Sequence, residues 1–154
     1  MKTLTYEQAL SLAASLCSRS EHCSSEIRKK LLLWGLSPVQ AEKAIGSLVD
    51  GKFIDSKRFC RAYCLDKFHY NHWGKIKISQ MLRMLEMDSS DIKEGLDAIP
   101  DEEYQEVLQH VLEQKNKQLK DSDSYIRKGK LVRHALSRGF ETHLILNIAD
   151  NLVD

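Results

Sequence analysis

The sequence has little of what a β-rich or membrane-spanning protein needs. Its 154 residues include only two prolines and seven glycines, and so few turn-forming residues suit long helices better than sheets. No apolar run approaches the roughly 18 residues that span a bilayer. The first residues, 1–5, lack the continuous apolar core of a signal peptide. We therefore expect a helical, cytoplasmic protein that does not contact a membrane.

Catalytic motifs are also missing. The chain has no glycine-rich phosphate loop, no Gly-x-Ser-x-Gly elbow and no His-Glu-x-x-His pair. A nucleotide-binding or hydrolytic site would therefore have to be built without its usual parts. We expect a protein that is not an enzyme and that uses no cofactor.

The cysteines are the best candidates for metal binding. Cys60 and Cys64 share one helix face and precede His69 and His72, and thiolate with imidazole suits zinc. Structural zinc sites usually use two close ligand pairs separated by a loop, whereas Cys60 and Cys64 lie inside an amphipathic pattern where small buried residues are needed. We therefore expect no metal, and reduced thiols in the cytoplasm, at all four cysteines: Cys17, Cys23, Cys60 and Cys64.

Positive and negative charges nearly balance over the whole chain, which has a net charge of +1. The distribution is nevertheless uneven. Residues 55–87 carry seven Lys or Arg against three Asp or Glu, and residues 88–123 carry four against eleven. Such asymmetry indicates a surface for polyanions or for a charged protein partner, although two solvated helix faces would give the same pattern. We expect the acidic segment to lie away from DNA.

Helix start and stop signals recur along the whole chain. Residues 5–8 and 37–40 are capping boxes, in which a Thr or Ser cap is followed three residues later by Gln. An apolar helical stripe ends at Val49, where we expect Gly51 to take the left-handed conformation that terminates a helix. Asp55 then caps the next helix.

The same order of signals predicts nine short helices in three sets of three. The second helix of each set ends at Gly35, Glu86 or Gly139, and these positions are 51 and 53 residues apart. Units of this size bury their faces poorly alone, so neighbours should stack. We therefore expect an all-α fold of three tandem, helix-turn-helix-like three-helix repeats in an elongated, curved array, with boundaries at 1–54, 55–100 and 101–154.

The order and spacing of several short motifs across nearly the whole chain resemble the RecX regulatory proteins, which modulate the RecA recombinase. The resemblance rests on Glu26-Ile27 through Lys30-Leu31 with Gly35, on Leu48 through Gly51, Phe53-Ile54-Asp55 and Arg58-Phe59, on Trp73-Gly74 with Ile76 and Ile78, and on Arg138-Gly139-Phe140.

The chain departs from this family at two positions. Many members have serine at the position of Cys23, so we expect Ser24 to cap the second helix here. Glu86 replaces the glycine that ends the second helix in the other two repeats.

The resemblance implies a monomeric, non-enzymatic protein that lies along the RecA–DNA filament and bridges neighbouring subunits. It also implies inhibition of RecA ATPase, strand exchange and coprotease activity, and hence regulation of DNA repair and the SOS response. Members of the family are described as binding DNA weakly and without sequence specificity.

Basic residues on predicted helix faces are our candidates for contact with phosphate or with an acidic partner surface, although most such residues are merely solvated. Trp73, beside Lys75 and Lys77, is a candidate for base stacking, and packing into a helix seam is the alternative. The basic candidates are Lys29, Lys30, Arg58, Arg61, Lys75, Lys77, Arg83, Arg127, Lys128, Lys130, Arg133 and Arg138.

A helix-turn-helix-like DNA-binding transcriptional regulator is the alternative function, because a three-helix unit with a basic second or third helix also fits that use. A typical repressor has one reading head and dimerises on a palindrome, whereas three units in one chain favour a monomer that follows a repeating lattice. A helical scaffold for another protein is a third possibility.

Overall fold

The computed structural model describes residues 3–153, and these form nine α-helices and no β-strand. The all-α prediction is therefore confirmed. No helix in this range is long and apolar enough to cross a membrane. The helices are α1 (Tyr6–Arg19), α2 (Ser24–Leu33), α3 (Pro38–Asp50), α4 (Ser56–Asn71), α5 (Lys75–Met84), α6 (Ser89–Asp97), α7 (Asp101–Gln118), α8 (Ser124–Ser137) and α9 (Thr142–Leu152).

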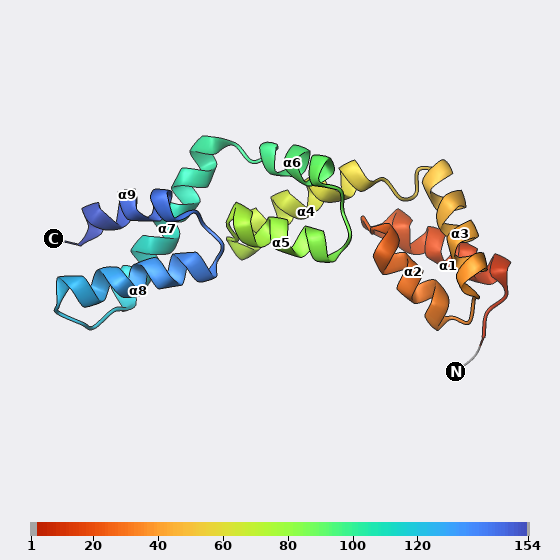
Figure 1. Ribbon diagram of the computed structural model, residues 1–154, viewed down its shortest axis with the longest axis horizontal. Coiled ribbons are helices and arrows are strands. Elements are labelled where there is room, and N and C mark those ends of the chain that lie inside the picture. Colours follow the sequence, from red (N-terminus) through yellow and green to blue (C-terminus); the bar gives the residue numbers. More distant parts are fainter. Residues whose placement is uncertain (1–2, 154) are drawn as a thin grey trace.

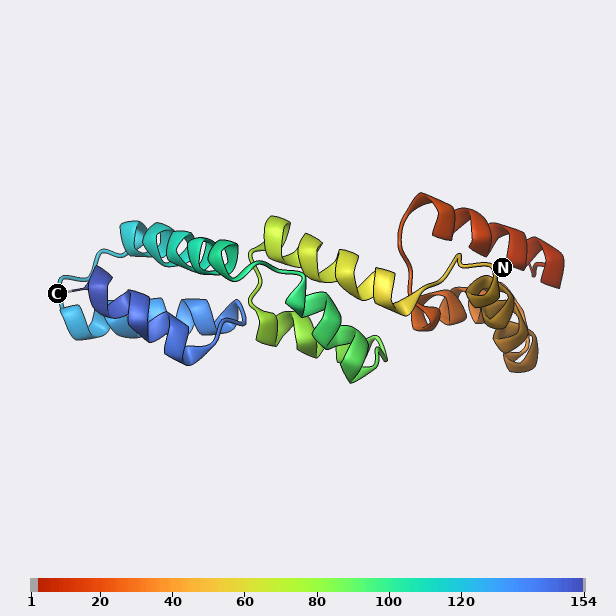
Figure 2. The ribbon, with the colours of Figure 1, turned by 90° about the horizontal axis from the view of Figure 1, so that it is seen from above.

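The helices form three consecutive groups along one axis, with the two chain ends at opposite ends of the molecule (Figures 1 and 2). We call them unit 1 (α1–α3), unit 2 (α4–α6) and unit 3 (α7–α9). Figure 1 shows that both outer units bend toward the same side, so the array is an arc. The tandem, curved architecture is thus as predicted, and the boundaries 1–54, 55–100 and 101–154 stay a prediction.

Side-chain caps begin several helices where the sequence predicts them. Thr5 Oγ1 accepts a hydrogen bond from the backbone N–H of Gln8 at 3.2 Å, and the Gln8 side chain accepts one from the Thr5 N–H at 3.0 Å. Ser37 and Gln40 form the same reciprocal pair at the start of α3. Asp55 Oδ1 accepts from the Arg58 N–H at 2.9 Å and begins α4. These contacts satisfy amide groups that have no partner inside the helix.

The prediction for Gly51 is wrong. Gly51 has φ −83°, and Lys52 takes the left-handed conformation instead, with φ 61°. The Phe53 N–H then donates to the Leu48 carbonyl at 2.9 Å, which completes the helix end. A Cβ on Gly51 would lie 3.2 Å from the Phe53 ring. The glycine is therefore used for the room it leaves beside Phe53 and not for its conformational freedom.

The prediction that Ser24 caps α2 is also wrong. Cys23 is the capping residue, with an extended backbone, and Ser24 is the first helical residue. The Glu26 carboxylate accepts a hydrogen bond from the Cys23 N–H at 3.1 Å. This contact from the third helical position fixes the start of α2 even though residue 23 is not a serine.

All three second helices end in the same left-handed turn. Gly35, Glu86 and Gly139 have φ values of 101°, 65° and 92°. At each end the next residue donates its N–H to the carbonyl five positions earlier, as Met87 does to Leu82 at 3.1 Å. The alignment of Gly35, Glu86 and Gly139 therefore matches positions with the same backbone conformation. Glu86 adopts this left-handed conformation although it has a side chain, which disfavours φ > 0.

The second helices α8, α5 and α2 lie head to tail along the lower edge of Figure 1. At the junction of units 2 and 3, the Gly74 N–H donates to the Arg138 carbonyl at 2.7 Å, and the Ile76 N–H donates to the Gly139 carbonyl at 3.0 Å. At the junction of units 1 and 2, Ser25 Oγ donates to the Leu85 carbonyl at 2.8 Å. The C-terminal end of α8 thus meets the N-terminal end of α5, and the C-terminal end of α5 meets the N-terminal end of α2.

Two apolar cores fill the arc. Unit 1 has its own core around Ile27, Leu31 and Leu48. Units 2 and 3 share a second core, into which Cys23 also projects from the start of α2. At the centre of the shared core, the Tyr104 ring lies 5.7 Å from that of Phe68 and 5.3 Å from that of Phe140. The junction of units 2 and 3 is therefore a packed interior, whereas that of units 1 and 2 is mainly polar.

The tight junction leads to a prediction about two glycines. A Cβ on Gly74 would lie 2.3 Å from the Gly139 carbonyl oxygen, whereas a Cβ on Gly46, in the middle of α3, would meet nothing within 4 Å. Gly74→Ala should lower the free energy of unfolding by about 1–3 kcal/mol, because two backbone segments must separate. Gly46→Ala should raise it by about 0.5–1 kcal/mol through helix propensity. Urea denaturation measures both changes, and equal stability of the two variants would contradict this account of the junction.

Candidate partner-binding surface

The predicted basic residues fall into two groups, those held by contacts inside the chain and those that are free. Arg58 belongs to the first group. Its Nε lies 2.6 Å from the Glu21 carboxylate, and its Nη2 donates to the Lys52 carbonyl at 3.0 Å. Arg58 therefore ties the connection before α2 and the end of α3 to the start of α4.

The predicted basic strip of unit 3 is also largely engaged inside the chain. Arg127 donates to the Asp121 carbonyl at 2.7 Å and to the Asn116 carbonyl at 3.1 Å. Lys130 Nζ lies 2.7 Å from the Asp121 carboxylate, and this hydrogen bond lowers the pKa of Asp121. Lys128 pairs with Asp150 of α9. The contacts of Arg127 and Lys130 close the connection between α7 and α8, and that of Lys128 joins α8 to α9.

Two further candidates lie at the junction of units 2 and 3. Arg138 Nη1 donates to the Asn71 carbonyl at 2.9 Å. Lys75 Nζ lies 4.9 Å from the centre of the Tyr104 ring and 4.0 Å from the Asp101 carboxylate. Both side chains are half-buried, so their first role is to hold the two units together.

The remaining six candidates have no carboxylate partner within 4.0 Å among residues 3–153. Four are exposed and two are half-buried. A cation without a counter-ion in the chain is available to an anionic partner. The exposed four are Lys29, Arg61, Arg83 and Arg133, and the half-buried two are Lys30 and Lys77.

Three of the free cations lie at related positions on the second helices. In the alignment of the three helix ends, Lys29 and Arg133 are equivalent, and Arg83 is equivalent to Leu32 and Leu136. Exposed apolar residues accompany them, with Leu33 60% and Met84 75% exposed. We call this surface the outer face of α2, α5 and α8; it comprises Lys29, Leu32, Leu33, Gln80, Arg83, Met84, Arg133, Leu136 and Ser137.

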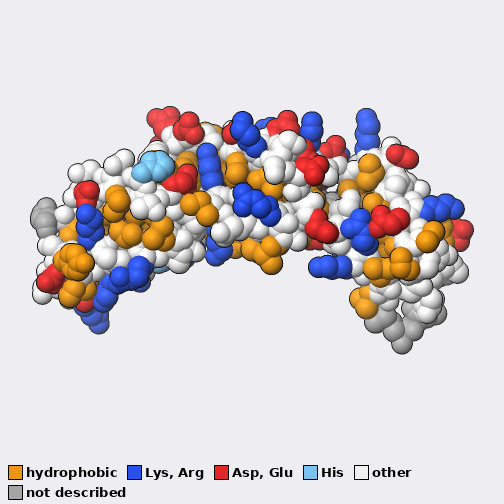
Figure 3. Space-filling model, in the orientation of Figure 1, with side chains coloured by type: hydrophobic (Ala, Val, Ile, Leu, Met, Phe, Trp, Pro, Cys, Tyr) orange, Lys and Arg blue, Asp and Glu red, His pale blue; other side chains and the backbone are white. Residues whose placement is uncertain are grey.

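Charge is distributed unevenly between the two edges of the arc. In Figure 3, basic and apolar side chains occur along the lower edge, where the second helices lie, whereas the upper edge near α6 and the start of α7 carries acidic side chains together with basic ones. The acids of residues 88–106 are exposed except for Asp91, which is buried. The lower edge is therefore the better surface for phosphate or for an acidic protein.

Trp73 packs against neighbouring side chains and does not present a free ring face for stacking on a base. The ring is half-buried against the shared core. Lys77 Nζ lies 4.5 Å from its centre and Lys67 Nζ lies 5.0 Å from it. The sequence analysis missed Lys67 because the left-handed turn at His72, with φ 55°, brings Trp73 back toward α4. Stacking on a base would require these lysines to move.

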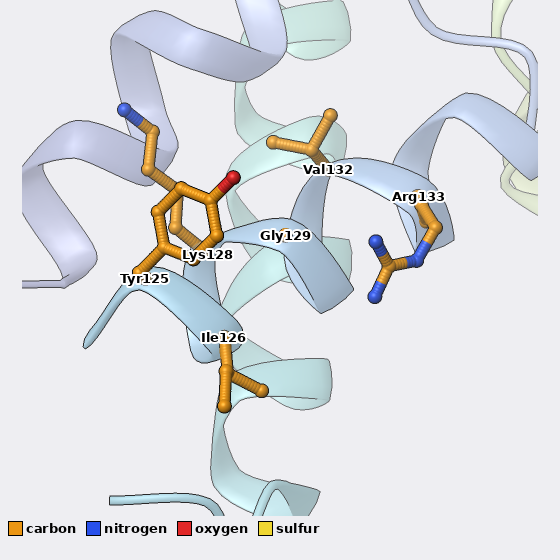
Figure 4. A pocket seen from close by; sticks show the side chains of 6 residues that line it. All are labelled: Tyr125, Ile126, Lys128, Gly129, Val132 and Arg133. Atoms are coloured by element: carbon orange, nitrogen blue, oxygen red, sulfur yellow. The ribbon is translucent and has the colours of Figure 1, made fainter. Parts of the chain in front are cut away.

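A hollow of about 480 Å³ lies beside the first turns of α8 (Figure 4). Tyr125 at its rim is 88% exposed. Gly129, which lines it, is equivalent to Ser25 and Ile76, the two residues that meet the end of the following second helix. The hollow thus lies at the position which, in α2 and α5, meets the end of the following second helix. Sequence analysis overlooked it, although Tyr125 and Ile126 depart from the buried pattern of α8.

The metal candidates are dispersed. Cys60 and Cys64 are fully buried where α4 packs on α6, and a Cβ on Gly95 would lie 3.0 Å from Cys64 Sγ. His69 Nε2 lies 3.3 Å from the Glu103 carboxylate, and the His72 ring faces that of His110. Among the described residues, no three His, Cys, Asp or Glu side chains come together as metal ligands.

The comparisons with known proteins agree with this architecture. A sequence model of a domain described as "RecX, third three-helix domain" matches residues 101–148. The chain is 31% identical over 133 residues to a regulatory protein RecX of Clostridium botulinum (strain Alaska E43 / Type E3), an alignment that covers 84% of this chain and 61% of that protein. The chain belongs to the RecX family.

A second relative and two solved structures extend the RecX comparison. A regulatory protein RecX of Lactobacillus johnsonii (strain CNCM I-12250 / La1 / NCC 533) is 24% identical over 144 residues, which are 94% of this chain and 53% of that protein. The chain thus spans 53–61% of the length of these two relatives. A crystal structure of regulatory protein RecX superposes with a TM-score of 0.85 at 21% identity, over 94% of this chain and 73% of that one. RecX from Lactobacillus salivarius gives 0.84 at 18% identity, over 96% of each chain. The RecX fold is therefore present throughout.

The division of the cations leads to a prediction about stability. Arg58→Ala removes an ion pair and two backbone hydrogen bonds, so it should lower the free energy of unfolding by about 1–2 kcal/mol. Arg61→Ala, three residues later on the exposed side of α4, should change it by less than about 0.5 kcal/mol. Thermal denaturation of both variants tests this, and an Arg58→Ala protein as stable as Arg61→Ala would show that the contacts of Arg58 contribute nothing.

The buried cysteines lead to a prediction about reactivity. Burial raises the pKa of the Cys60 thiol to about 11 and that of Cys64 to about 12. Because the thiolate is the reactive form, iodoacetamide at pH 8 should alkylate both residues at least ~10-fold more slowly in the folded protein than in guanidinium. Mass spectrometry of quenched samples measures the two rates. Fast labelling of the folded protein would mean that the α4–α6 contact opens readily.

Proposed function

We propose that this chain is a non-enzymatic regulator that binds RecA–DNA filaments as a monomer in the cytoplasm. Binding inhibits RecA ATPase, strand exchange and coprotease activity, and so regulates DNA repair and the SOS response. Membership in the RecX family supports a regulatory role, and the RecA partner comes from the resemblance described above.

The observation that carries the proposal is the repeated outer face of α2, α5 and α8. Its free cations and exposed apolar side chains recur at related positions along one edge of an arc. A ligand whose contacts repeat along its length gains affinity when its partner offers repeated sites, because each contact after the first is intramolecular. A filament of identical subunits offers such sites, and free subunits do not.

The composition of this face suits a nucleoprotein partner. Arg83, Arg133 and Lys29 can neutralise phosphate or acidic side chains, and each cation that contacts phosphate adds to affinity through counter-ion release. Leu33 and Met84 provide apolar area, which adds to affinity only when the partner also offers an apolar surface. Bare DNA would therefore use only part of the face, in keeping with weak, non-specific DNA binding.

Charge reversal on the outer face tests the proposal. The triple variant Lys29→Glu, Arg83→Glu, Arg133→Glu should weaken inhibition of the ATPase of RecA assembled on single-stranded DNA by about tenfold or more, because like charges then face the filament. The unmodified protein should inhibit at amounts well below one per RecA subunit. The measurement is ATP hydrolysis titrated with each protein, together with co-sedimentation.

The matched control is Arg19→Glu, Lys117→Glu, Lys120→Glu, which changes the net charge equally at exposed residues outside the second helices. It should inhibit like the unmodified protein. If both triple variants lost inhibition equally, the change in net charge alone would explain the effect. Absence of inhibition and of co-sedimentation by the unmodified protein would refute the function, and sequence-specific binding to naked duplex would favour a transcriptional regulator.

A further inference from the structure

A second hollow, of about 260 Å³, lies between the end of α4 and the helices α7 and α8. It is apart from the outer face and opens at the junction of units 2 and 3. Every charged or titratable side chain that lines it is basic: His72 from the end of α4, His110 and Lys115 from α7, and His134 and Arg138 from α8. Gln114, Gln118 and Val111 complete the lining. We call this the histidine cleft.

None of these five basic groups has a carboxylate within 4.0 Å among the described residues. No acid of α7 lines the cleft. Glu103 contacts His69, and Glu113 accepts a hydrogen bond from Gln109. The helix α8 and its C-cap, residues 124–138, contain no acid. Lys115 and Arg138 carry the permanent charge of the cleft, and without a counter-ion among the described residues they create a site of positive potential that increases as the histidines become protonated.

The cleft is held in shape by contacts that leave its centre open. Arg138 is fixed by its hydrogen bond to the Asn71 carbonyl at 2.9 Å. The His72 and His110 rings meet edge to face, with centroids 5.9 Å apart. The left-handed backbone at His72 turns its ring toward α7. A ligand would therefore meet donors that are already in position, which reduces the entropic cost of binding.

We infer that the histidine cleft binds a phosphate group. All of its polar side chains can donate hydrogen bonds when the histidines are protonated, and phosphate is an anion that accepts several at once. The group could belong to a nucleic-acid backbone or to a free polyphosphate, and both present the same oxygens. This inference does not depend on RecA, and it names a site outside the outer face.

Binding should depend on pH. Burial lowers the pKa of His72, helped by the charges of His110 and Arg138, and burial lowers that of His134, helped by Lys115 and Arg138. An anion in the cleft opposes these effects and favours the protonated rings. Phosphate should therefore bind more tightly as the pH falls from 7.5 to 6.0, and binding should raise both histidine pKa values.

The test is NMR titration of the full chain, following the histidine ring signals at pH 7.5 and pH 6.0. One arm uses inorganic pyrophosphate and the other a 12-residue oligothymidylate. We expect the signals of His72, His110 and His134 to shift. The affinity for the oligonucleotide, whose phosphodiesters keep their charge over this range, should be at least ~3-fold higher at pH 6.0. A stronger effect of the oligonucleotide assigns the cleft to a nucleic-acid backbone, and a stronger effect of pyrophosphate assigns it to a free polyphosphate.

Lys115→Gln should weaken binding about fivefold or more, because a cation at the site is lost. Lys117→Gln, on an exposed position of the same helix, is the matched control and should bind like the unmodified protein. The inference fails if neither probe shifts the three histidines, or if Lys115→Gln and Lys117→Gln bind equally. Oligonucleotide binding without histidine shifts, as expected for the outer face alone, would exclude a nucleic-acid backbone as the occupant of the cleft.

Discussion

The contact between the end of one second helix and the start of the preceding one determines the architecture. Each of these helices ends in a left-handed turn that exposes its last carbonyls. The neighbouring unit supplies donors to the ends of α5 and α8, and the N–H of Leu4 in the same unit donates to the end of α2. The turn persists at Glu86, where a non-glycine residue pays about 1 kcal/mol or more for φ > 0. The junction must therefore be favourable enough to offset this cost. The outer face exists because these contacts align three helices in register.

The same contacts explain why half of the predicted cations are engaged inside the chain. Joining short units leaves many backbone carbonyls at helix ends and in connections without a hydrogen-bond donor. Arginine, which has several N–H donors, is well suited to supply them. Arg58, Arg127 and Arg138 each donate to at least one backbone carbonyl. The four exposed cations without a carboxylate partner among the described residues remain available to a partner.

Local signals predicted much of this structure. Capping boxes at Thr5 and Ser37 depend on residues three positions apart, so the sequence alone reveals them, and the repeat of helix ends exposed the tandem fold. Contacts between distant segments were not predictable in this way. The partner of Arg58 is 37 residues away, and the shift from Gly51 to Lys52 depends on the position of the Phe53 ring. The histidine cleft unites residues from three helices, and no sequence spacing marks it.

The two junctions of the arc differ in their mechanical properties. Units 2 and 3 share one apolar interior with a cluster of aromatic rings, and bending there would open close-packed contacts. Unit 1 has a separate core and meets unit 2 mainly through hydrogen bonds, ion pairs and the side chain of Cys23. Polar contacts at a surface can be exchanged for water at little cost. Bending should therefore be easier between units 1 and 2 than between units 2 and 3, and such bending would let unit 1 adjust to the shape of a partner surface.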